Sequence, residues 1–162
     1  MRTRFAFAML ALFAVSMGLK AADDPMLGSW KLNIAKSKFG SGPAIQAETN
    51  QVEPFGGNGI KLTAQITRAD GTNVTESYAG TFDGKPFSVG GDANVDTAYL
   101  KRIDAHTMER INKKAGKPTT TMKYVVTKDG KTKTVTITGA TAKGEPVNTV
   151  LVFEKQEVRN QF

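Results

Sequence analysis

The stretch from Ile60 to Thr67, Ile-Lys-Leu-Thr-Ala-Gln-Ile-Thr, alternates an apolar residue with a polar residue at every step. Successive side chains of a β-strand point to opposite faces, so this period of two predicts a strand that is buried on one side. The same period recurs downstream in stretches whose apolar members are Val74, Tyr78, Phe82, Val135 and Ile137. The chain is therefore expected to consist of half-buried strands.

Turn-forming pairs separate these stretches, at Asp70-Gly71, Asp83-Gly84, Asp129-Gly130 and Lys143-Gly144. Such pairs favour two-residue hairpins, because glycine accepts the positive φ that a type I′ turn requires. Longer links are expected at 90–96 and 114–118, and the segment Ile34–Phe39 is the one helix candidate. The spacing of the turns gives about ten strands.

Short loops make strands that are neighbours in sequence pair with one another, so the order is expected to be up-and-down. A meander of this kind exposes two edges unless it closes on itself. We therefore predict an all-β fold: a single antiparallel up-and-down barrel of about 8–10 strands over residues 26–156, with at most one short helix after the first strand. A Greek-key sandwich is the alternative.

The first residues predict an exported protein. Arg2 and Arg4 precede the uncharged, apolar run Phe5–Leu19, and small residues follow at Ala21 and Ala22. This is the pattern of a secretory signal peptide, which we place at residues 1–21. A retained membrane anchor is the alternative, but the run is shorter than the roughly 20 apolar residues of a spanning helix. Residues 157–162 are expected to form a C-terminal tail, and the location to be periplasmic or extracellular.

Charge and composition exclude several functions. The formal net charge is +7, and removal of residues 1–21 takes away three basic residues and no acidic one. The remaining basic residues are dispersed, without the basic clusters and interleaved aromatic residues of a nucleic-acid-binding surface. The sequence has no cysteine and a single histidine, and it contains no recognisable catalytic or nucleotide-binding motif. We expect no catalytic residues, metal or cofactor.

Two motifs carry a resemblance to a known superfamily. Gly28-Ser-Trp30 opens the first expected strand, and Val152-Phe-Glu-Lys155 ends the last. Both resemble the calycins, which include the lipocalins and the fatty-acid-binding proteins. The resemblance implies that Trp30 plugs the closed end of the barrel, with Lys155 over its ring through a cation–π contact. The start Gly28–Asn33 also resembles a group of secreted bacterial proteins, a likeness that implies no activity.

Glu76 shares the parity of Val74 and Tyr78, so its carboxylate is expected to face the apolar side of its strand. A carboxylate buried in that way must be paired or have a raised pKa. It would serve as a polar anchor inside a cavity, with Tyr78 and Tyr124 in the wall. In the alternative, which we favour for this residue, Glu76 lies in a bulge or in water at the barrel mouth.

Arg102 and Arg110 flank a turn expected at Asp104-Ala105, which should bring them near one another on paired strands. An inward arginine can hold a carboxylate through two parallel hydrogen bonds, and fatty-acid-binding proteins use an inward Arg with a Tyr in this way. The Arg-x-Tyr motif of those proteins is absent, since Val150 and Val152 occupy the corresponding region. Ion pairing at the surface is the interpretation we favour for both arginines.

Together these features predict an exported, non-enzymatic barrel that holds a small hydrophobic or amphipathic molecule, with Glu76, Tyr78, Arg102, Arg110 and Tyr124 as the candidate ligand-binding residues. We expect no nucleic-acid partner and no stable membrane anchor after cleavage. The alternative is an envelope-associated structural or interaction module whose barrel is filled and binds no ligand. A cavity would distinguish the two.

Overall fold

The computed structural model describes residues 24–40 and 44–157. The expected signal peptide and all of the expected tail except Glu157 lie outside this part of the chain. The described residues form ten strands and one short 3-10 helix, Ile34–Lys36. The strands are β1 (Gly28–Leu32), β2 (Ile45–Phe55), β3 (Gly59–Arg68), β4 (Asn73–Thr81), β5 (Phe87–Gly90), β6 (Thr97–Asp104), β7 (Thr107–Lys114), β8 (Lys117–Val126), β9 (Thr132–Ala140) and β10 (Pro146–Gln156).

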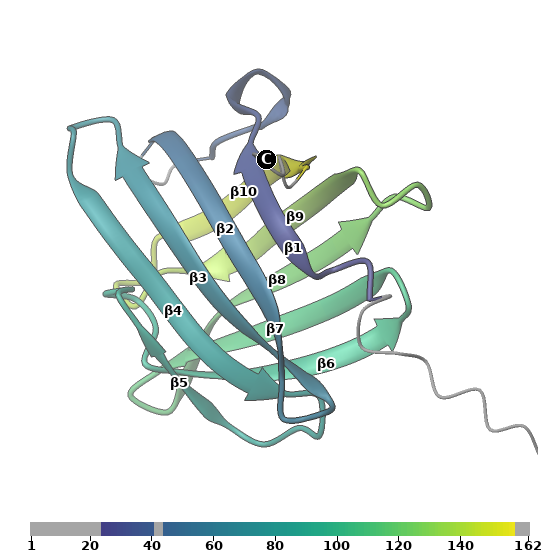
Figure 1. The fold of residues 1–162 in the computed structure, drawn as a ribbon. Helices are drawn as coiled ribbons and strands as arrows, with labels where there is room; N and C mark the ends of the chain where they lie inside the picture. Colours follow the sequence, from purple (N-terminus) through teal and green to yellow (C-terminus); the bar gives the residue numbers. More distant parts are fainter. Residues whose placement is uncertain (1–23, 41–43, 158–162) are drawn as a thin grey trace, which may run out of the picture.

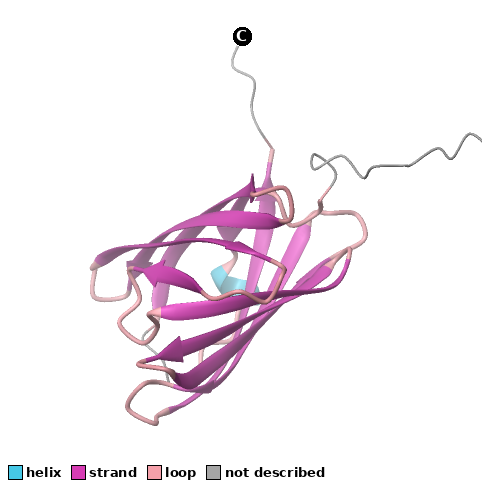
Figure 2. Cartoon of the chain, turned by 90° about the horizontal axis from the view of Figure 1, so that it is seen from below, coloured by secondary structure: helices cyan, strands magenta, loops and turns pink. Residues whose placement is uncertain are grey.

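The strands form one closed antiparallel barrel, in which each strand pairs with its neighbours in sequence (Figure 1). β1 completes the ring by pairing with both β2 and β10, so that Trp30 lies opposite Asn50 on one side and Lys155 on the other. The predicted up-and-down barrel is confirmed, and the Greek-key alternative is wrong. The short helix predicted after β1 is present, and it is the single helical element in the described residues (Figure 2).

The alternation seen in the sequence decides which side chains fill the barrel. In β3, Ile60, Leu62 and Ala64 are buried, whereas Lys61 between them is exposed. Inward residues of the other strands add to one continuous hydrophobic core, whose members include Val52, Tyr78, Leu100, Met108, Tyr124, Val135, Leu151 and Phe153. The period of two therefore separates interior from surface around the whole ring.

The glycine turns differ from the two-residue hairpins that were expected. At Asp70-Gly71 the strands are separated by four residues, and positive φ is found at Gly71 alone. The Asp70 carboxylate accepts a hydrogen bond from the backbone N–H of Thr72, which supports the wider loop. A two-residue turn with positive φ at both positions does occur, at Ala115-Gly116 between β7 and β8. It lies where a longer link was expected.

The chain after β1 returns to the edge of β10. Ile34–Lys36 forms a single helical turn rather than the longer helix expected over Ile34–Phe39. Beyond it, the backbone of Lys38 exchanges two hydrogen bonds with Val150, of 2.7 and 2.8 Å. Val150 and Val152, on the outer face of β10, are only half-buried.

The two ends of the barrel are built differently. The end where β1 begins is closed by the segment that precedes it, which contributes the buried Met26. The opposite end, which we call the mouth, is bounded by the connections after β1, β3, β5, β7 and β9. Among these is the loop 91–96, the longer link predicted between β5 and β6.

We predict that Gly91→Ala destabilises the barrel far more than Gly71→Ala. Both glycines have positive φ, of 86° and 82°. A residue with a Cβ in this backbone conformation lowers the free energy of unfolding by roughly 1–2 kcal/mol. A Cβ at Gly91 would also lie 1.9 Å from the Thr75 carbonyl oxygen. A Cβ at Gly71 would have no heavy atom within 4 Å. Urea denaturation should show about 1 kcal/mol lost for Gly71→Ala and clearly more for Gly91→Ala. Equal losses of stability in the two variants would contradict the close approach of Gly91 to the Thr75 backbone.

Candidate functional site

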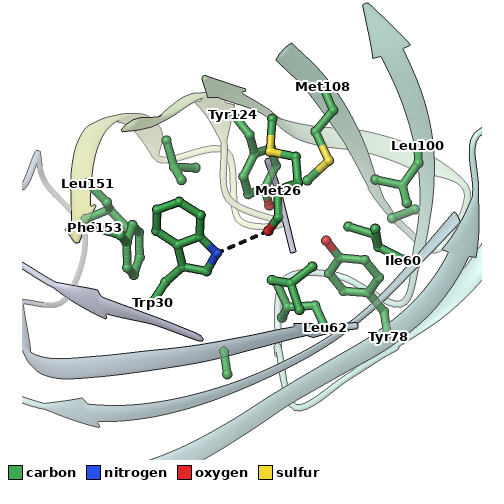
Figure 3. Close-up of a cluster of buried hydrophobic side chains, with 14 of the residues drawn as sticks. Met26, Trp30, Ile60, Leu62, Tyr78, Leu100, Met108, Tyr124, Leu151 and Phe153 are labelled. Atoms are coloured by element: carbon green, nitrogen blue, oxygen red, sulfur yellow. Dashed lines mark hydrogen bonds between the residues drawn. The ribbon is translucent and has the colours of Figure 1, made fainter. Parts of the chain in front are cut away.

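Trp30 closes the barrel at the end opposite the mouth. Its side chain is fully buried, and its indole N–H donates a 3.1 Å hydrogen bond to the Met26 carbonyl (Figure 3). The structure brings Lys155 to this ring, with Nζ 5.0 Å from the ring centroid. A polar indole N–H inside a core needs such a partner, and Met26 supplies it from the chain just before β1.

A second lysine, which sequence reasoning missed, lies over the same ring. Lys133 Nζ is 4.7 Å from the Trp30 ring and 4.9 Å from the Phe153 ring, and the residue is 2% exposed. Burial lowers the pKa of Lys133 to about 7. Lys133 shares the parity of Val135 and Ile137, so the alternation in β9 was the signal that could have placed it inside.

A cavity of about 240 Å³ occupies the mouth half of the barrel and is partly open to solvent. Its walls are mainly aliphatic and come from strands all around the ring, with contributions from Ile45, Ile66, Val74, Met122, Ile137 and Val147. Polar and charged side chains, Arg110 and Glu76 among them, also line it. A cavity with apolar walls and a few polar groups is the common form of a small-molecule site.

The charged groups at the floor of this cavity are joined to each other. Arg110 donates from Nη1 to Glu76 Oε1 at 2.6 Å and from Nε to Asn112 Oδ1 at 2.8 Å. The side chain of Arg110 is 1% exposed and that of Glu76 15%. The solvated position that we favoured for Glu76 and the surface position that we favoured for Arg110 are both wrong. The ion pair allows the two charges to remain inside.

The tyrosines lie below this ion pair. The guanidinium carbon of Arg110 is 4.9 Å from the Tyr78 ring centroid. Tyr124 lines a second, deeper cavity of about 30 Å³, whose wall also includes Arg110. Its hydroxyl lies 3.4 Å from Met122 Sδ. Burial raises the pKa of both tyrosines, so they are neutral at physiological pH.

Glu48 is the floor residue that sequence reasoning missed. It lines both cavities, is 8% exposed, and accepts a 3.0 Å hydrogen bond from Asn50 Nδ2. Burial, with a further contribution from Glu76, raises the pKa of Glu48 to about 7. Glu48 shares its parity in β2 with the buried Val52, whereas Ile45, on the opposite parity, also lines the cavity. The two are compatible because the register shifts between Ile45 and Ala47, so the apolar residues of β2 gave conflicting signals of its inward side.

Arg102 lies apart from the other candidate residues. Its guanidinium forms an ion pair with Asp24, in the segment before β1, and lies 4.2 Å from the Phe82 ring centroid. Arg102 does not line either of the two cavities, and neither does Tyr78, which was expected in the wall and is instead buried in the core below them. The structure therefore brings Glu76, Tyr78, Arg110 and Tyr124 together and leaves Arg102 near the closed end.

The barrel is similar to two solved structures of the fluorescent protein UnaG, a point mutant and the wild type. The alignments have TM-scores of 0.52 and 0.50, with 15% and 14% sequence identity. They cover 82% and 81% of this chain and 97% of the UnaG chain in each case. At this level of identity the similarity concerns the fold alone, and neither a family model nor a curated protein matches the sequence.

Residues 24–40 and 44–157 contain no group of three or more His, Cys, Asp or Glu residues placed to hold a metal ion. The same residues contain no helix of the length and hydropathy needed to cross a bilayer.

We predict that Glu76→Gln lowers the free energy of unfolding by about 3 kcal/mol, because it leaves the Arg110 guanidinium buried without a counter-charge. The double variant Glu76→Gln with Arg110→Met should recover most of this loss. Glu53→Gln is the control, since it removes an exposed carboxylate that pairs with Lys61. An ion pair at the surface contributes at most about 1 kcal/mol to stability. A loss from Glu76→Gln no larger than the control's would contradict a buried ion pair.

Lys133 predicts a pH dependence of stability. Its pKa is about 7 in the folded chain, compared with the ordinary lysine value of 10.5 expected in the unfolded chain. Between these two pH values the unfolded chain binds more protons, so stability rises with pH. The wild type should therefore gain stability relative to Lys133→Met between pH 7 and pH 10. Urea denaturation at both pH values measures this gain. Lys123→Met, at an exposed position of β8, should show no such trend.

Proposed function

We propose that the protein binds a small amphipathic molecule in the mouth cavity. The aliphatic walls take up the apolar part, and the charged floor fixes the polar end. The observation that carries the proposal is an open cavity of about 240 Å³ that ends on buried, mutually paired charges. A barrel serving only as a filled structural module has no need of such a cavity, which speaks against that alternative.

The size of the cavity limits what it can hold. At about 240 Å³ the cavity is smaller than the roughly 300–1,000 Å³ that is usual for the sites of drug-sized ligands. A longer molecule would extend through the mouth into solvent. The proposed ligand is therefore a short-chain or single-ring compound, and not a long-chain lipid that is fully enclosed.

We propose binding rather than catalysis as the activity. Arg110 donates hydrogen bonds to both Glu76 and Asn112, an arrangement that supports a fixed polar surface at the floor. We also propose that the protein acts outside the cytoplasm, on the basis of the basic and apolar start of the sequence. The similarity to UnaG supports a hollow barrel and carries no ligand over to this chain.

We predict that a larger side chain at Val74 weakens binding of a neutral probe, 1-octanol. Val74 lines the cavity from β4, and a phenyl ring there takes up space that the ligand needs. Isothermal titration calorimetry should show a Kd at least tenfold higher for Val74→Phe than for the wild type. Thr75→Phe, at the next and exposed position of β4, should stay within twofold.

Circular dichroism and urea denaturation of both variants would establish that they are folded. Wild-type protein that binds no 1-octanol, or Val74→Phe protein that binds it as the wild type does, would overturn the proposed function.

A further inference from the structure

The charge inside the cavity has the opposite sign to that of the whole chain. The sequence carries a formal net charge of +7. The charged residues that line the mouth cavity are three carboxylates and two guanidiniums, namely Glu48, Glu76, Asp92, Arg68 and Arg110. Arg68 lies at the end of β3, next to the mouth, whereas Glu48 and Arg110 are buried. The deep part of the cavity therefore holds two carboxylates and a single guanidinium.

The guanidinium at the floor already has its partners. Arg110 donates to Glu76 and to Asn112, and it packs against the ring of Tyr78. Asn112 is held in turn by a 2.9 Å hydrogen bond from its Nδ2 to Thr120 Oγ1. An anionic ligand group would have to displace Glu76 from Arg110 and would then lie in a pocket that holds both Glu76 and Glu48. The arrangement disfavours an anion.

Glu48, in contrast, lacks a cationic partner. No ion pair involving Glu48 is formed within the described part of the chain, and its neighbour Asn50 donates to it as a neutral amide. Lys133 acts on Glu48 only at longer range, because its Nζ lies over the rings of Trp30 and Phe153. A buried carboxylate in this position is stabilised by any cation that reaches it.

A second acceptor lies beside Glu48. Asn50 Oδ1 is buried and has no hydrogen-bond partner, and Asn50 lines the small deep cavity together with Glu48. A buried carbonyl without a donor is costly. The carboxylate of Glu48 and the amide oxygen of Asn50 thus form a pair of acceptors, and the group that satisfies both must carry more than one N–H.

We infer that the polar end of the ligand is a primary ammonium or amidinium group, held by Glu48 and Asn50, with its short apolar part directed toward the mouth. This inference rests on the proposed function, and it adds the chemical class of the ligand. An ammonium offers three N–H donors and a positive charge. Its charge would neutralise the Glu48 carboxylate, and one of its N–H groups would donate to Asn50 Oδ1.

The inference also predicts how binding responds to pH. The charged and titratable groups around Glu48 are Glu76 on β4, Arg110 on β7 and Lys133 on β9, with Asp92 at the mouth. Because the pKa of Glu48 is about 7, its carboxylate is largely ionised at pH 8 and largely protonated at pH 6. Binding of a cation should weaken as the pH falls through this range. Lys133, which gains its proton over the same range, acts in the same direction.

The test compares three probes that share one chain and differ in head group: n-octylammonium, 1-octanol and n-octanoate. Calorimetry with the wild type at pH 8 should give a Kd for octylammonium at least tenfold lower than for octanol, with octanoate binding most weakly. Lowering the pH to 6 should raise the Kd of octylammonium several-fold and leave that of octanol unchanged. These measurements on unmodified protein do not depend on any variant folding.

Glu48→Gln tests the residue itself. It should bring the Kd of octylammonium to within about twofold of that of octanol, reduce the pH dependence to the part contributed by Lys133, and leave octanol binding unchanged. Glu53→Gln, on the same strand but facing solvent, is the matched control and should behave as the wild type.

The possible failures are distinguishable. If octanol binds but octylammonium binds no more tightly, or if octanoate binds best, the inferred ammonium site is wrong and the proposed function stands. If Glu48→Gln retains the full preference for octylammonium, Glu48 is not the group that holds it. Wild-type protein that binds none of the three probes overturns the inference together with the proposed function.

Discussion

Closure of the ring through β1 is the constraint on which the rest of the structure depends. This strand has five residues, yet it pairs with β2 on one edge and β10 on the other. Without it the sheet has two open edges and no interior. With it, every inward side chain meets others from across the barrel, and Trp30, carried by β1, is placed at the centre of the closed end. The same strand thus closes the ring and fills one end of it.

Once the ring is closed, its interior divides into two parts of different character. The half near Trp30 is packed with large apolar side chains and with Lys133, whose charge lies over two aromatic rings. The mouth half is wider than its side chains can fill, and the cavity remains there. The boundary between the two is polar, formed by Arg110, Glu76 and Glu48. Buried charges are tolerated at this level because they face one another or the cavity.

The inward arginine has a different role from the one suggested by the resemblance to fatty-acid-binding proteins. An arginine and a tyrosine do meet inside the barrel, as Arg110 and Tyr78, but they come from β7 and β4 rather than from a motif near the end of the chain. Glu76 occupies the position beside the Arg110 guanidinium that a ligand carboxylate would need. The floor of the barrel therefore has another electrostatic character than the resemblance implies, set by one acidic residue on β4 and another on β2.

The sequence alone determined the strands, their up-and-down order and the inward parity of Glu76, because the period of two and the glycine turns are local properties of the chain. It left undecided how deep Glu76 lies and what it contacts. Arg110 is 34 positions away in the sequence, so only the closed ring brings their strands face to face. Glu48 could not be placed from the sequence, because Ile45 and Val52, the apolar residues toward the two ends of β2, lie on opposite parities. The register shift between Ile45 and Ala47 that accounts for this is a feature of the pairing with β3. The size of the cavity was likewise decided by tertiary structure, because it is the volume that all the inward side chains together leave empty.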